Sequence, residues 1–137
     1  MQTLQRDSID TMQYVIAIEK RCQVRQGLAS PVRGKQGATP VAQFDVVVRA
    51  GVAFDESQLT GQGWFVDTDA AEMAVAEVAL HLASAKWTEL FDFRPTFELV
   101  ARWAFRHLEP RIPQVAFVEL NNITLNVCTC YSKCHSK

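Results

Sequence analysis

Two helical patterns follow one another directly in this chain, over residues 69–86 and 95–109, with no strand-like run between them. Parallel strands need a crossover that alternates strands with helices, so two consecutive helices exclude that architecture. Strand-like runs stand on both sides of the helical pair. The resulting order, β-β-α-α-β-β, predicts an α+β domain in which an antiparallel four-stranded sheet carries both helices on one face.

Each helix has its own start signal. Asp69 and Glu72 have the spacing of an N-cap and a capping box, which predicts that the first helix begins at Asp69. Asp67 is expected to cap the same entry. Thr96 follows Pro95 at the start of the second helix, where proline is favoured. Thr96 is therefore expected to cap this helix, and its hydroxyl is also a candidate contact for a ligand.

The strand pattern predicts two pairs of strands with different connections. The four runs cover residues 13–24, 41–54, 114–120 and 123–131. A loop of about 16 residues separates the first two, and loops of that length are usually functional. Gly51 suggests a β-bulge in the second strand. Asn121-Asn122 suits a two-residue turn between the last two strands, because asparagine tolerates positive φ.

Composition sets the broad class of protein. The chain has 137 residues, 48% of them apolar and 21% charged, with a net charge of −1. These values predict one domain over 1–137, with flexible polar ends at 1–12 and 132–137. The balanced charge argues against nucleic acid as a partner. No apolar run is long enough for a membrane span, and the first residues lack a secretory apolar region. A cytoplasmic location is expected.

Four short motifs in a fixed order resemble a known family. They cover about residues 40–131 and are Gly63-Trp64-Phe65-Val66-Asp67, Pro95-Thr96-Phe97-Glu98-Leu99-Val100-Ala101-Arg102-Trp103, Val118-Glu119-Leu120 and Tyr131. Their order resembles the T-fold family of 6-pyruvoyl tetrahydropterin synthase and its bacterial relative, 6-carboxytetrahydropterin synthase. The matching family patterns are Gly-Met-Val-x-Asp, Pro-Thr-x-Glu-x-Leu-Ala-x-Trp, Val-x-Glu-Thr and a closing Tyr.

The resemblance implies an assembly and a ligand. Sheets of several subunits would close into one barrel, giving a trimer or hexamer with sites between subunits. The ligand would be a pterin-like small molecule of the tetrahydrobiopterin type, and the reaction a carbon–oxygen lyase-like synthesis. Glu119 would anchor the ring, because a carboxylate accepts two N–H bonds from a 2-amino-4-oxo heterocycle. Thr96 would be the second ligand-binding residue.

The sequence lacks the zinc-binding and catalytic residues of the family. The three zinc-binding His positions fall near Lys20, Ala38 and Pro40, none of which ligates zinc. Residues 23–40 contain no counterpart of the catalytic Cys, and Leu82-Ala83-Ser84 replaces the Leu-Asp-His segment. We therefore expect no metal and no cofactor, and a pterin-binding protein whose synthase activity is altered or lost. The catalytic residues stay unassigned, with Lys20, Glu19 and Asp45 as candidates for proton transfer.

The alternative function belongs to another class: a non-enzymatic oligomeric T-fold module that binds a partner protein. A third hypothesis concerns metal binding by the C-terminal run Cys128-x-Cys130-x3-Cys134-His135. Zinc favours such thiolate and imidazole ligands, and four of them would close a structural site. The spacing matches no defined zinc motif. The favoured interpretation is therefore that Cys128 and Cys130 are ordinary strand residues and that Cys134 lies in a flexible tail, with no metal bound. The three tryptophans, Trp64, Trp87 and Trp103, are expected to be core or interface anchors.

Overall fold

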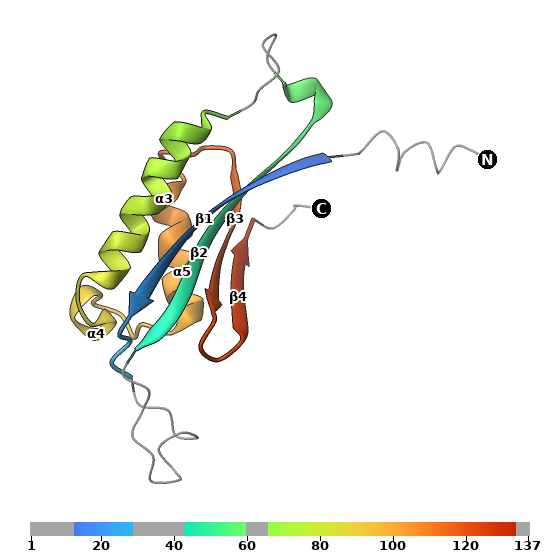
Figure 1. The fold of residues 1–137 in the computed structure, drawn as a ribbon. Helices are drawn as coiled ribbons and strands as arrows, with labels where there is room; N and C mark the ends of the chain where they lie inside the picture. The colour runs from blue at the N-terminus through green and yellow to red at the C-terminus, as the bar shows by residue number, and fades with distance from the viewer. Residues whose placement is uncertain (1–12, 29–42, 60–65, 134–137) are drawn as a thin grey trace.

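The structure is a computed structural model, and it describes residues 13–28, 43–59 and 66–133. Its elements are β1 (Gln13–Val24), β2 (Phe44–Asp55), a 3-10 turn η1 (Glu56–Gln58), α3 (Thr68–Ala83), α4 (Trp87–Leu90), α5 (Phe97–Leu108), β3 (Val115–Asn122) and β4 (Val127–Ser132). The strands form one antiparallel sheet in the order β1-β2-β3-β4, and α3 and α5 lie on the same side of it (Figure 1). The α+β prediction is confirmed.

The core lies between the sheet and the helices, with α3 over β1 and β2 and α5 over β3 and β4. Alternate residues of β2, among them Val46, Val48 and Ala50, are buried on this side. They are β-branched or small, which suits a pleated buried surface. On α5 the stripe of Val100, Ala104 and other apolar residues is buried in the same layer. Residues between the buried strand positions point to the opposite side, which we call the helix-free face.

The first helix begins at Thr68, one residue earlier than predicted, and the expected capping role of Asp67 is confirmed. Asp67, rather than Asp69, is the N-cap, because its carboxylate accepts bonds from the main-chain N–H groups of Asp69 and Ala70, both at 3.1 Å. Glu72 makes no capping box, since its carboxylate contacts Lys20 Nζ at 3.2 Å. The helix also ends at Ala83 rather than near residue 86. A separate short helix, α4, follows it.

The last hairpin turns later than Asn121-Asn122. Both asparagines belong to β3, and the turn occupies residues 123–126, with Asn126 at φ 58°. Asn122 is buried, and its side-chain oxygen accepts from the Leu125 N–H at 3.1 Å, which braces the turn. The side-chain acceptor of Asn122 thus stabilises a four-residue turn instead of forming a two-residue one. The bulge predicted at Gly51 is confirmed by a register shift between Gly51 and Val52.

Several predictions fall on residues that the structure does not describe. These are residues 1–12, most of residues 25–40, the Gly63–Phe65 part of the first motif, and residues 134–137 with Cys134 and His135. Within the described ranges, no helix is long and apolar enough to cross a membrane.

Candidate ligand-binding site

Glu119 lies on the helix-free face in the middle of the sheet, where Arg49 holds its carboxylate. Arg49 Nη1 donates to Glu119 Oε1 at 3.0 Å, and Arg49 Nε lies 3.2 Å from Glu19 Oε2 without hydrogen-bond alignment. The Arg49 guanidinium also lies over the Phe117 ring, 5.7 Å from its centroid. The Glu119 side chain is 24% exposed. The carboxylate is therefore oriented and charge-balanced, with Arg49 bonded to one of its two oxygens.

Thr96 lies at a pocket of about 460 Å³ on the other side of the sheet, where α5 begins and β3 ends. Its Oγ1 accepts from the Leu99 N–H at 3.2 Å, so the predicted capping role is confirmed. A hydroxyl that accepts one bond still has a proton to donate, so capping leaves Thr96 able to contact a ligand. The size and the mixed lining of the pocket suit a small ring compound.

Two buried amides line the same pocket. Gln26 Nε2 donates to the Pro95 carbonyl at 2.9 Å, which ties the segment after β1 to the start of α5. Asn122 uses its oxygen on the turn at Leu125, as described above. Phe44 adds an apolar side chain to the pocket wall, and Thr129 adds a polar one. Since buried amides need partners, these bonds fix the shape of the pocket.

The structure does not bring Glu119 and Thr96 together within one chain. Val118 and Leu120, on either side of Glu119, are fully buried against the helices, so Glu119 must point away from them. Thr96 is on the helix side, beside the buried Asn122. The two residues predicted to bind one ligand therefore lie on opposite faces of the sheet.

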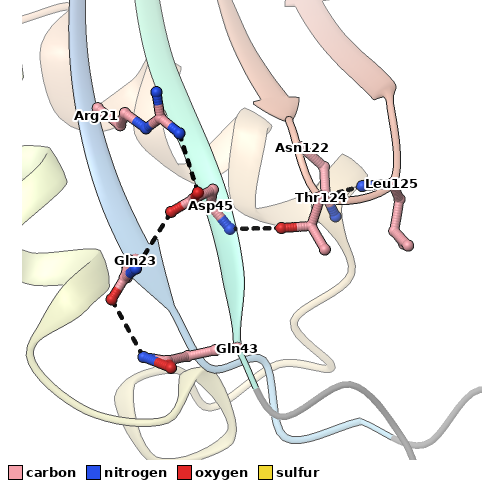
Figure 2. Close-up of polar contacts among 7 residues, drawn as sticks. All are labelled: Arg21, Gln23, Gln43, Asp45, Asn122, Thr124 and Leu125. Atoms are coloured by element: carbon pink, nitrogen blue, oxygen red, sulfur yellow. Dashed lines mark hydrogen bonds and ion pairs between the residues drawn. The ribbon is translucent and has the colours of Figure 1, made fainter.

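A third polar cluster surrounds Asp45 near the start of β2 (Figure 2). Arg21 Nη2 contacts Asp45 Oδ2 at 3.0 Å, and Gln23 Nε2 donates to Asp45 Oδ1 at 3.4 Å. Gln43 in turn donates to Gln23 at 3.3 Å. The Asp45 N–H donates to Thr124 Oγ1 at 2.8 Å, linking this cluster to the β3–β4 turn. The hydrogen bonds from Arg21 and Gln23 lower the pKa of Asp45, so it is a weak proton acceptor.

The other candidates for proton transfer are also separated by the structure. Lys20 points to the helix side, where it pairs with Glu72. Glu19 lies on the helix-free face and shares Arg49 with Glu119. Cys22 is not an activated nucleophile, because burial, and secondarily the Asp45 charge, raise the pKa of its thiol to about 11. Of these groups, only Glu19 lies beside the predicted ring anchor.

The lowered pKa of Asp45 predicts how the stability of the protein changes in acid. The unfolded-state pKa of an aspartate is about 3.9, and the folded-state pKa lies below it. Asp45 therefore contributes stability that is present above about pH 4 and is lost as the pH falls through the folded pKa. The difference in unfolding free energy between wild type and Asp45→Asn should shrink in acid. Urea unfolding of both proteins at a series of pH values measures this difference in unfolding free energy. A difference independent of pH would contradict the lowered pKa of Asp45.

Sequence reasoning missed the roles of Arg49, Asn122 and Gln26. Arg49 could have been found only from the strand register, which places it opposite both Glu19 and Glu119. The sequence predicts a turn at Asn121-Asn122 because asparagine tolerates positive φ. The position of Asn122 two residues after Leu120 on the buried side of β3 was the available signal.

Comparisons with known proteins agree with the geometry. Residues 46–133 match the family model described as PTPS, 6-pyruvoyl tetrahydropterin synthase. The structure is similar to that of Caenorhabditis elegans 6-pyruvoyl tetrahydropterin synthase, with a TM-score of 0.55 and 14% sequence identity over 90% of this chain and 94% of that chain. At this identity the structural likeness shows the fold. No curated protein matches the sequence significantly.

Proposed function

The chain belongs to the 6-pyruvoyl tetrahydropterin synthase family and has its T-fold, and from this premise we propose that it binds a pterin-like ligand. The observation that carries the proposal is the pocket at Thr96, which combines a hydroxyl, two buried amides and apolar walls in about 460 Å³. Fixed polar groups beside apolar walls give orientation and specificity to a heterocyclic ligand. Thr96, Phe97 and Glu98, at the start of α5, line one side of it.

Glu119 anchors the ring in this proposal, and its position requires more than one subunit. Because Glu119 and Thr96 lie on opposite faces, a site that uses both takes them from different chains. Edge strands present unpaired main-chain groups and invite pairing. In the described sheet, β1 and β4 are such edges. A homo-oligomer, either a trimer or a hexamer, is therefore part of the proposal.

We further propose that the synthase activity is metal-independent or lost. Of the three zinc-binding positions, Lys20 carries an ammonium group, which has no lone pair to offer a metal, and it is paired with Glu72. Ala38 and Pro40 offer no ligating side chain and lie outside the described residues. A remaining lyase-like reaction would have to use Glu19 for proton transfer beside Glu119.

A second function, that of a non-enzymatic partner-binding module, has its own support. Large apolar side chains are exposed on both edges of the sheet, including Tyr14 and Val15 on β1 and Val127 on β4. Leu80 on α3 is 71% exposed. Exposed apolar groups that gather along edges are typical of protein-binding surfaces.

A fluorescence titration with neopterin tests the proposal. We expect saturable binding to the wild-type protein that Glu119→Gln weakens at least about tenfold, which corresponds to about 1.4 kcal/mol. Thr96→Ser keeps both the cap and the hydroxyl, so it should bind as the wild type does, whereas Thr96→Ala should bind more weakly. Asn121→Ala, on the helix-free face beside Glu119, is the matched control and should leave binding unchanged.

The same titration separates the alternatives. Binding that is indifferent to Glu119→Gln but abolished by Asn122→Ala would place the ligand wholly in the pocket of one chain and remove the anchor role from Glu119. Absence of binding up to about 1 mM neopterin, a limit of about −4.1 kcal/mol, would overturn the pterin proposal. The partner-binding function would then be preferred.

A further inference from the structure

Two free thiols stand side by side on the edge of the sheet. Cys128 and Cys130 both belong to β4, are exposed, and are separated by one residue. Residues two apart on a strand point to the same face. The register places Cys130 opposite Glu119 and Cys128 opposite Asn121, so both thiols are on the helix-free face. Pairing of the β4 edge with another strand would use main-chain groups rather than these side chains.

The two thiols influence one another electrostatically, because the Cys128 charge helps to raise the pKa of Cys130. The pKa of Cys130 is raised by burial, by Glu119 and by Cys128, and Arg49 opposes the shift. A direct disulfide between them fits poorly, since strand geometry puts their Cα atoms roughly 6.8 Å apart. That value is at the upper end of the range of about 4.4–6.8 Å seen in disulfides. An ion between the two sulfurs suits the wider spacing better than an S–S bond.

We propose that Cys128 and Cys130 form a two-coordinate site for a soft monovalent metal ion, Cu(I), on the helix-free face of β4. Thiolates are the ligands that select Cu(I), whereas zinc in structural sites takes four ligands. Among the described residues, no group of three or more His, Cys, Asp and Glu side chains could hold a metal. Glu119, the nearest acid across the strand, is a hard oxygen ligand already paired with Arg49. A pair of sulfurs therefore matches Cu(I) rather than zinc.

The proposed complex would carry a net charge that a neighbouring cation can offset. Two thiols bind one Cu(I) and release two protons to solvent, which leaves a bis-thiolate complex with a net charge of −1. Burial and the Glu119 charge raise the pKa of both thiols, and the Arg49 charge opposes this shift. The Arg49 guanidinium can offset the charge of the complex on the same face. This site lies on the opposite face of the sheet from the Thr96 pocket, and it adjoins Glu119, the proposed ring anchor, across the strand from Cys130.

Anaerobic titration of the reduced full-length protein with Cu(I), in competition with a chromophoric Cu(I) chelator, tests the proposal. We expect one Cu(I) per chain, with Cys128→Ser and Cys130→Ser each weakening binding at least about tenfold. Cys22→Ser is the matched control, since it removes one thiol from β1 at the opposite edge of the sheet and should leave binding unchanged. X-ray absorption on the wild-type complex should show two sulfur ligands, a measurement that needs no variant.

Three results would overturn the assignment. Affinity and stoichiometry unchanged in both Cys128→Ser and Cys130→Ser would remove these thiols from any copper site. Loss of binding in Cys134→Ser with retention in the other two would place the metal on the C-terminal residues instead. Zinc that binds as tightly as Cu(I), with four ligands in the absorption spectrum, would exclude a two-coordinate site.

Discussion

Replacing Trp87 with alanine is expected to lower the free energy of unfolding by about 3–5 kcal/mol, the usual cost of removing a large aromatic from a core. Trp87 is completely buried, and its ring lies 5.0 Å from that of Phe97 at the start of α5. Its Nε1 donates to the Leu82 carbonyl at 3.0 Å, and its main-chain N–H donates to the Arg25 carbonyl at 2.8 Å. Trp87 thus joins the end of α3 to the end of β1 and to α5.

Urea unfolding, followed by far-ultraviolet circular dichroism, measures this loss. Trp103→Ala is the matched control, because Trp103 is only partly buried and stacks between His81 and His107 at the surface of the helices. It should cost clearly less than Trp87→Ala. A larger loss in the Trp103 variant would mean that the core has been placed wrongly.

The overall fold could be predicted because its main signal is local. Two adjacent helical patterns with no intervening strand restrict the topology to an antiparallel sheet with both helices on one face. Prolines and apolar periodicity mark the second helix, and Thr96 was identified correctly as its cap. These features depend on neighbours in sequence, because helix capping and helical periodicity involve residues only three or four positions apart.

The candidate site could not be predicted to the same degree because it depends on register. Asp67 and Asp69 are both good caps, and only the path of the chain into α3 decides between them. Glu119 and Thr96 were expected at one ligand, yet the pleat places them on opposite sides of the sheet. A motif match gives the order of residues along the chain, whereas the face of each residue follows from its pairing with other strands.

Leu120→Ala is also expected to cause a large loss of stability. It tests directly which face of the sheet each side chain of β3 occupies. Leu120 belongs to β3 and is fully buried on the helix side of the sheet, so its truncation should cost about 2–5 kcal/mol of unfolding free energy. The cost combines the lost transfer free energy of the side chain with a cavity that the surrounding side chains fill only in part. Equilibrium urea unfolding, with the slope of the transition checked against wild type, gives the value.

Asn121→Ala is the matched control for this measurement, since the next residue along β3 points to the helix-free face. It should change the unfolding free energy by about 0.5 kcal/mol or less, as surface substitutions usually do. If Asn121→Ala were the more damaging of the two, β3 would be shifted by one residue, and every side chain on it would exchange faces. Glu119 would then point toward the helices and could share a site with Thr96 in one chain. The pair of variants therefore decides whether a ligand that contacts both residues needs a second subunit.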